Sequence, residues 1–157
     1  MDSRSVVTSF LACWSVQDLE MALAHLHPEI VYTLHNGPDA RPFSGSHSGI
    51  DSCRQLGYTV LAEFDYLHYE PTIVGVKGSV VNVHVVSRLR HRTTGSVVEG
   101  SQRSIFEVRD DLIVRIDIYE DAPRIEAFMK LTAHRLANGQ LAKAPMLPRP
   151  AKQGSAR

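Results

Sequence analysis

The sequence predicts an α+β domain in which helices pack on one face of a strongly curved antiparallel sheet. Its 157 residues are close to the length of one compact domain. Apart from one short β-rich stretch, apolar residues recur at the helical spacing of three or four up to about residue 64, and then alternate with a period of two over residues 66–119. The later strands have short connections, which requires antiparallel pairing because parallel strands need a long crossover.

The composition is that of an ordinary globular protein, with 43% hydrophobic and 22% charged residues. Seventeen Lys and Arg balance seventeen Asp and Glu, and the pI is about 7.1. This balance gives no charge excess for nucleic acid or an anionic membrane, so neither partner is expected. No apolar run reaches the roughly 18 residues of a membrane span and no secretory signal is visible, so a cytoplasmic location is expected.

Two helices and a strand are expected first. Apolar residues at helical spacing predict an amphipathic helix over residues 3–14. Ser15, three residues before Asp18, forms a capping-box-like pattern and predicts the start of a second helix, which Pro28 ends. Residues 30–35 are β-rich and predict a short strand.

An irregular loop and a third helix follow. Asn36-Gly37-Pro38 marks a turn, and the loop is expected to continue to about His47. Ser48 and Asp51 repeat the capping-box pattern, and the apolar spacing over residues 50–64 predicts a helix. We expect this helix to be the longest of the chain.

Four β-rich runs then predict a curled antiparallel meander. They are expected at residues 66–76, 80–92, 97–108 and 112–119. Residues typical of tight hairpins separate the runs, namely Lys77-Gly78, Thr94-Gly95 and Asp110-Asp111.

A last helix and a tail complete the chain. Asp121 resembles an N-cap with Pro123 in the first turn, and the helix is expected to end near Leu136. The segment that follows is rich in proline and basic residues and has few large apolar residues. The sequence therefore predicts one domain over residues 1–136 and a tail over residues 137–157.

Several short segments, each weak alone, carry a resemblance through their order and spacing over roughly residues 3–132. They are Phe-Leu-Ala-Cys-Trp-Ser-Val-Gln-Asp at residues 10–18, Ile-Val-Tyr at 30–32, Ser44-Gly45 with Gly49-Ile50, Ile-Phe-Glu-Val at 105–108, Leu112-Ile113, and Tyr-Glu-Asp at 119–121. In these features the chain resembles the nuclear transport factor 2-like superfamily, in the branch of SnoaL-like polyketide cyclases and ketosteroid-isomerase-like proteins. The resemblance implies a cone-shaped α+β barrel and a homodimer formed through the open face of the sheet.

The sequence lacks the catalytic residues of the ketosteroid isomerase mechanism, although the resemblance extends to that branch. Those enzymes abstract a proton with an Asp and stabilise the enolate with a Tyr and a protonated Asp. Alignment on Ser44-Gly45 places Asn36, Phe10 and Ser104 at or beside these three positions. All three roles are unfilled, so steroid isomerisation by that mechanism is not expected.

Two other branches of the superfamily offer different chemistry. Limonene-epoxide-hydrolase-like members use an Arg that bridges two aspartates, and the comparable set here is Arg88, Arg103 and Asp117 without a second aspartate. Scytalone-dehydratase-like members use His residues with Tyr and Asp, and this chain contains eight histidines and five tyrosines. The second comparison favours a histidine as the acid or base.

His84 and Asp117 are the candidate catalytic residues. His84 shares one face of its strand with Asn82, and a histidine can act as a general acid or base at physiological pH. Asp117 or Asn82 could orient it. The alternative is that these residues lie on the outer face, against water or a partner subunit, and Arg115 beside Asp117 indicates such a polar face with equal force.

Further polar and aromatic residues are candidates for substrate binding. Tyr32 and Tyr58 could line the cavity mouth, while Trp14 could close the cone floor or pack the helices. The alternative for Arg103 is a structural ion pair with an acid on a neighbouring strand, and the alternative for Tyr119 is packing in the core. The full candidate set is Trp14, Tyr32, His35, Asn36, Tyr58, Asn82, Arg103 and Tyr119. No close spacing supports a metal site from His35, His47 and His84, so none is expected.

Two functions remain open. The first is a cofactor-independent cyclase, isomerase or dehydratase that acts on a small apolar molecule. The second is a non-catalytic ligand-binding or dimeric assembly module. Whether His84 and Asp117 converge in one cavity discriminates between them.

Overall fold

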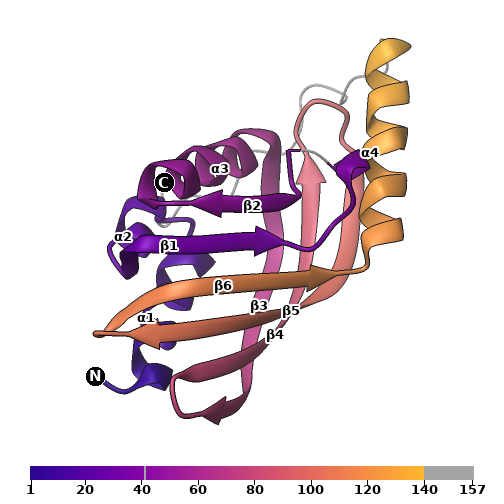
Figure 1. The fold of residues 1–157 in the computed structure, drawn as a ribbon. Helices are drawn as coiled ribbons and strands as arrows, with labels where there is room; N and C mark the ends of the chain where they lie inside the picture. Colours follow the sequence, from indigo (N-terminus) through magenta and orange to yellow (C-terminus); the bar gives the residue numbers. More distant parts are fainter. Residues whose placement is uncertain (41, 140–157) are drawn as a thin grey trace.

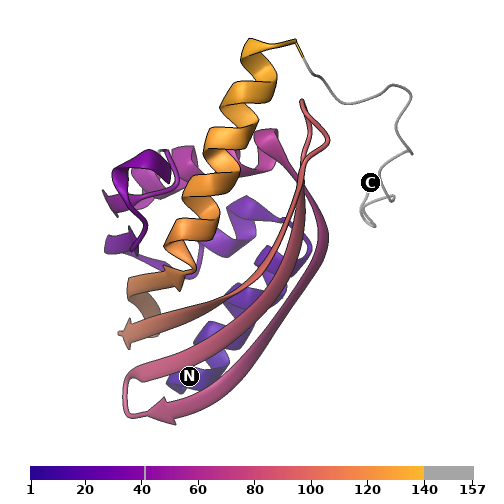
Figure 2. The ribbon, with the colours of Figure 1, turned by 90° about the vertical axis from the view of Figure 1, so that its right-hand side faces the viewer.

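A six-stranded curved sheet and the helices on its concave side form the domain (Figures 1 and 2). A computed structural model describes residues 1–40 and 42–139. The strands are β1 (Leu26–Leu34), β2 (Gly45–Ser48), β3 (Phe64–Lys77), β4 (Val80–His91), β5 (Val97–Arg109) and β6 (Leu112–Glu120). The helices are α1 (Ser3–Ser15), α2 (Leu19–Leu23), α3 (Ile50–Glu63), α4 (Ala122–Ala137) and the short 3-10 helix η1 (Pro38–Ala40). The predicted α+β class is confirmed.

The sheet order is β2-β1-β6-β5-β4-β3, so β2 and β3 are its edges and the cone is not a closed barrel. Strands β3 to β6 pair antiparallel in succession, as the short turns predict. Strand β1 instead pairs parallel with β6. This parallel pairing places the C-terminal ends of β1 and β6 side by side.

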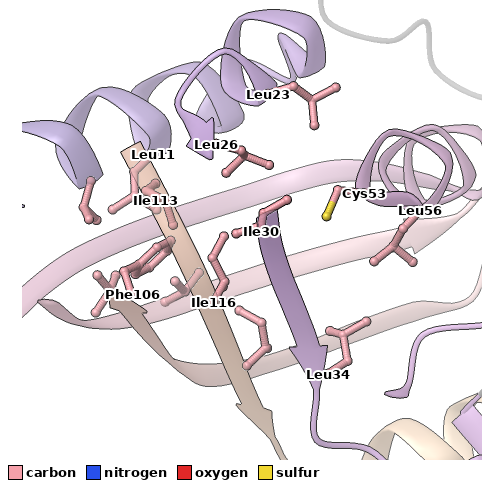
Figure 3. Packing of buried hydrophobic residues seen from close by; sticks show 14 of the residues in the cluster. Leu11, Leu23, Leu26, Ile30, Leu34, Cys53, Leu56, Phe106, Ile113 and Ile116 are labelled. Carbon is pink, nitrogen blue, oxygen red and sulfur yellow. The ribbon is translucent and has the colours of Figure 1, made fainter. Parts of the chain in front are cut away.

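The core lies between the concave face of the sheet and the helices (Figure 3). Ile30, Ile113 and Ile116 are fully buried there, together with Val6 and Val7 of α1. Burying one aliphatic side chain of this size stabilises a fold by about 1.5–3 kcal/mol. Figure 2 shows the long strands β3 to β5 curving around α1. Register shifts in β3 accompany this curvature, as β-bulges do.

The second helix is shorter than predicted, and its cap is different. Asp18 is the N-cap, and its side chain accepts a hydrogen bond from the backbone N–H of Met21. The Ser15 hydroxyl donates instead to the carbonyl of Leu11 within α1. Pro28 does not end the helix but lies within β1, where the register with β6 is irregular. Proline has no N–H to donate to a regular ladder. It is tolerated here because the pairing with β6 is irregular at this point.

The predicted loop contains an additional strand. β2 pairs antiparallel with the end of β1, and the hydroxyls of Thr33 and Ser46 lie 2.9 Å apart across the pair. The predicted capping box of α3 is wrong, because the N-cap is Gly49 at φ 86° and makes no side-chain cap hydrogen bond. The longest described helix is α4, with 16 residues, rather than α3 with 14.

The last helix begins as predicted, with Asp121 as N-cap and a hydrogen bond from the backbone N–H of Arg124 to its carboxylate. Residues 140–157, most of the predicted tail, lie outside the described residues. Within the described part of the chain, no helix is both long and apolar enough to cross a membrane.

Candidate active site in the cone

A cavity of about 170 Å³ lies between the concave face of the sheet and the helices. Its wall is mostly apolar and rich in aromatic rings, which are those of Phe10, Trp14, Tyr32, Phe43, Phe64, Tyr66, Tyr69, Phe106 and Phe128. An apolar cavity of about 150 Å³ holds a molecule the size of benzene. The cone therefore has room for a single-ring molecule.

Among the described residues that line this apolar cavity, Glu120 alone carries a carboxyl group. Glu120 is the last residue of β6 and continues the alternation of Ile116 and Ile118, which also line the cavity. Side chains two residues apart on a strand point to the same face. The strand geometry therefore directs Glu120 inward.

Asn36 holds the Glu120 carboxyl from the neighbouring segment. Its side-chain Nδ2 donates to Glu120 Oε1 at 2.9 Å and to the carbonyl of Phe43 at 2.9 Å. The second oxygen of Glu120 receives no hydrogen bond from any described residue. Glu120 thus has one oxygen fixed by the protein and one left for a ligand.

Burial raises the pKa of Glu120 above its ordinary value, and the hydrogen bond from Asn36 opposes this rise only in part. Burial disfavours the charged carboxylate because water no longer solvates it. A raised pKa in a carboxyl group that lines a cavity is a feature of many general acids and bases.

Three tyrosines share the cavity with Glu120. Burial raises the pKa of Tyr32, Tyr66 and Tyr69, and the charges of neighbouring tyrosines and Glu120 add to the rise at Tyr32 and Tyr66. The indole N–H of Trp14 opposes the rise at Tyr66, against which it packs edge-on with ring centroids 5.8 Å apart. All three phenols are therefore protonated at neutral pH and can donate hydrogen bonds.

The cavity is suited to uncharged ligands. No Lys, Arg or His is among the described residues that line it. A buried anion without a cationic partner is costly. Among the described residues, the hydroxyls of Tyr32 and Tyr69 have no hydrogen-bond partner, so they can bind an oxygen atom of a neutral molecule.

The predicted pair of His84 and Asp117 does not meet in this cavity. Val83 and Val85 point inward from β4, so His84 between them is exposed on the outer face. Asp117 lies between Ile116 and Ile118 and also points outward. The expectation that the two side chains converge in the cone is wrong, because the alternation of each strand puts them on its convex side.

Asp117 belongs to a polar cluster on the outer face. Its Oδ1 lies 2.9 Å from His35 Nε2, and its Oδ2 accepts from Arg115 Nε at 2.8 Å. The His35 ring stacks on Tyr119 with centroids 4.2 Å apart, and the Arg103 guanidinium lies 4.9 Å from the centre of the Tyr119 ring. His35, Arg103 and Tyr119, which were predicted to bind substrate, therefore lie outside the cavity.

The other predicted binding residues are divided between the two sides. Trp14 and Tyr32 line the cavity, and Asn36 contacts Glu120 at its edge. Asn82 shares the outer face with His84. Tyr58 is exposed on α3, where its hydroxyl donates to Glu20 at 2.9 Å.

No metal centre is formed by the described residues, since no three His, Cys, Asp or Glu side chains among them gather at one point. Of the three histidines weighed for such a site, His35 contacts Asp117, His84 is exposed on β4, and His47 lies near the carbonyl of Ser44. Of the described residues in the cavity wall, Glu120 offers a carboxyl and Cys53 a thiol.

Sequence reasoning missed the cavity residues Glu120, Tyr66 and Tyr69. The signal for Glu120 was present, since it is an acid at a position where the period of two requires an apolar residue. The alignment on Ser44-Gly45 did find inward positions, because Phe10 and Ser104 line the cavity and Asn36 reaches Glu120. The carboxyl group comes from the end of β6 instead.

The half-open conical sheet, with an aromatic cavity on its concave side, defines the class of small α+β cone domains. The chain belongs to the SnoaL-like domain family, whose model matches residues 7–116. This family is part of the nuclear transport factor 2-like superfamily, so the resemblance noted in the sequence is confirmed.

Solved structures share the fold. A nuclear transport factor 2-like protein from Burkholderia xenovorans LB400 is 20% identical with a TM-score of 0.69, covering 80% of this chain and 93% of its own. A provisionally named polyketide cyclase from Xanthomonas campestris pv. campestris is 18% identical with a TM-score of 0.66, covering 81% and 96%. TerC, co-crystallised with polyporic acid, is 16% identical with a TM-score of 0.69, covering 82% and 98%. No curated protein matches the chain.

Proposed function

We propose that this protein binds a small, neutral, largely apolar molecule in the cone and catalyses cofactor-independent proton transfer on it, as a cyclase, isomerase or dehydratase does. The observation that carries the proposal is the carboxyl of Glu120, which lies in the wall of an aromatic cavity and is held there on one oxygen by Asn36. The names of the neighbours, a polyketide cyclase and TerC with its bound polyporic acid, agree with such a cavity.

In this proposal, Glu120 removes a proton from a carbon next to a carbonyl group of the ligand. The electrons of the broken C–H bond form the enolate, and its negative charge develops on the carbonyl oxygen. The hydroxyls of Tyr32 and Tyr69 donate hydrogen bonds to that oxygen. Glu120 then returns the proton to another atom of the ligand, so no oxidant, metal or cofactor is required.

The test uses a simple ketone of the right size, cyclohexanone, with cyclohexanecarboxylate as an anion of similar size. Trp14 is the single tryptophan of the chain and lines the cavity, so its indole N–H signal in an NMR spectrum reports occupancy. We expect cyclohexanone to shift this signal and the carboxylate not to. A shift with the anion alone would contradict the assignment of the ligand class.

Exchange of the ketone's α-hydrogens in heavy water tests the chemistry. We expect the wild-type protein to accelerate this exchange and Glu120→Gln to slow it by about 100-fold or more, with the indole shift retained. Equal exchange with both proteins would contradict the role of Glu120.

The second candidate function is binding without turnover. It is favoured by the mismatches to the ketosteroid isomerase mechanism, since Phe10, Asn36 and Ser104 replace the Tyr and the two Asp residues. In that case cyclohexanone shifts the Trp14 signal, while neither the wild-type protein nor Glu120→Gln accelerates exchange. The same two measurements therefore separate the candidates.

We also propose a homodimer formed through the outer face of the sheet, as the family resemblance implies. The exposed apolar residues Val86 and Val97 on this face support the proposal. Light scattering on the purified protein tests it, since a monomeric mass would contradict it.

A cytoplasmic location is also a proposal, as is a single domain over residues 1–136 followed by a tail. Limited proteolysis that stops near residue 136 would support this domain boundary.

A further inference from the structure

Two contacts join the same two chain segments, one on each face of the sheet. On the outer face, the ring of His35 stacks on Tyr119 with centroids 4.2 Å apart and planes 3° from parallel. On the inner side, the next residue of each segment makes the second contact, in which Asn36 donates to Glu120 at 2.9 Å. Consecutive residues of extended chain point in opposite directions, so both contacts depend on the same backbone register.

His35 is fastened to β6 at three points. Its backbone N–H donates to the carbonyl of Ile118 at 2.9 Å. Its Nε2 lies 2.9 Å from Asp117 Oδ1, and Asp117 is only 7% exposed and is itself held by Arg115. The stack on Tyr119 is the third point. All three partners lie in the four residues that end at Glu120.

The position of Asn36 depends on this fastening. Asn36 stands where β1 has ended and the segment toward η1 begins. Its amide also donates to the carbonyl of Phe43, which lies beyond η1. The outer contacts hold the backbone of His35 against β6 and so fix the point from which the Asn36 side chain extends toward Glu120.

We propose that His35 and Tyr119 are positioning residues for Glu120, because their stack on the outer face holds Asn36 against the carboxyl in the cavity. The proposal rests on the proposed function, in which Glu120 is the acid–base group. Both rings of the stack are partly exposed, His35 at 36% and Tyr119 at 37%. His35→Ala also removes the contact with Asp117 and is expected to cost some stability, whereas Tyr119→Ala leaves that contact in place.

The test measures the pKa of Glu120 by NMR of ¹³C-labelled glutamate carboxyls, with Glu120→Gln identifying the signal. Asn36→Ala removes the hydrogen bond that lowers the pKa of Glu120, so this variant is expected to raise that pKa and serves as the reference. We expect His35→Ala and Tyr119→Ala to raise the pKa in the same direction. The Asn36 side-chain amide signals are expected to shift in both variants.

Two control variants keep the stack intact. Tyr119→Phe retains the ring, and His84→Ala removes an exposed imidazole on the same face that makes no described contact with His35. Both are expected to leave the pKa of Glu120 at its wild-type value. Thermal unfolding of each variant shows whether the fold is retained.

Wild-type values for the pKa of Glu120 in His35→Ala and Tyr119→Ala would overturn the positioning role while leaving the proposed function standing. Loss of folding in both variants would also overturn it, because the stack would then be a general support of the fold. A Glu120 pKa at the ordinary value in the wild-type protein would instead contradict the proposed function itself.

Discussion

Asp117 and Glu120 are three residues apart on one strand, and the protein shifts the pKa of their carboxyls in opposite directions. Burial raises the pKa of Asp117, but the hydrogen bonds from Arg115 and His35 outweigh burial and leave it below its ordinary value. Burial also raises the pKa of Glu120, and there the single hydrogen bond from Asn36 does not compensate. The outward carboxyl is therefore a structural anion, whereas the raised pKa of the inward one supports its proposed role as the acid–base group.

Glu120 is expected to cost stability at neutral pH. A carboxyl whose pKa is raised on folding stabilises the fold only while protonated, so its contribution falls as pH rises from the ordinary value of 4.5 toward the folded pKa. Glu120→Gln keeps the acceptor for Asn36 and removes the charge. We expect its stability relative to the wild-type protein to increase with pH, measured by urea unfolding from pH 4 to about pH 8. A difference that does not change with pH would contradict the raised pKa.

Asp117→Asn is expected to show the opposite pH dependence. At neutral pH it weakens charged hydrogen bonds around a buried group, which costs about 1.5–3 kcal/mol in the free energy of unfolding. Because the folded pKa of Asp117 is lowered, its contribution is present above the ordinary value of 3.8 and is lost as pH falls through the folded pKa. The loss on mutation should therefore shrink in acid.

The exposed ion pair of Glu99 with Arg88 gives a matched control for this experiment. Glu99→Gln removes a surface charge pair on the same face of the sheet and is expected to cost less than about 1 kcal/mol. If Asp117→Asn costs no more than this control at pH 7, the buried cluster with His35 and Arg115 does not stabilise the fold.

The hydroxyls of Tyr32 and Tyr69 are expected to contribute to ligand affinity and not to the stability of the fold. Tyr32→Phe and Tyr69→Phe each remove a hydroxyl that has no partner among the described residues, so thermal stability should stay close to the wild-type value. Affinity for cyclohexanone, followed by the Trp14 indole signal, should fall by roughly three- to tenfold for each lost neutral hydrogen bond. Unchanged affinity in both variants would remove these hydroxyls from the site.

Cys53 is expected to react slowly with thiol reagents. It lines the cavity wall and is buried, and burial raises its pKa to about 11. Only the thiolate reacts, so the labelling rate of Cys53 should rise about tenfold per pH unit as long as the pH stays below its pKa. The rate is measured in Cys13→Ser, which leaves Cys53 as the single cysteine, and bound cyclohexanone should slow it further. Fast labelling that the ketone does not affect would mean that Cys53 does not face the cavity.

The sheet was predictable where its signals are local. Alternating apolar residues and turn residues such as Gly78 and Asp110 specify β3 to β6 without information from the rest of the chain. Strand β2 was missed because its residues, Gly45–Ser48, carry no apolar alternation and depend on pairing with β1. Pro28 was misread for the same reason, since the irregular register that admits it exists only in the assembled sheet.

The site was less predictable than the fold. The alternation of residues along β4 correctly placed His84 on the opposite face from Val83 and Val85. A period of two does not say, however, which of the two faces lines the cavity. The contact of Asn36 with Glu120 joins residues 84 positions apart, and it exists because β1 pairs parallel with β6. A parallel partner across such a distance leaves no pattern in a single sequence.

The pKa of Glu120 in the wild-type protein is the most direct test of the central claim, that a buried carboxyl in the cone acts as its acid–base group. It can be measured by titrating ¹³C-labelled glutamate carboxyls by NMR, with Glu120→Gln to identify the signal. The structure predicts a pKa clearly above the ordinary glutamate value of 4.5. A value at or below 4.5 would mean that water or a cation solvates the carboxylate, and it would contradict the proposed chemistry.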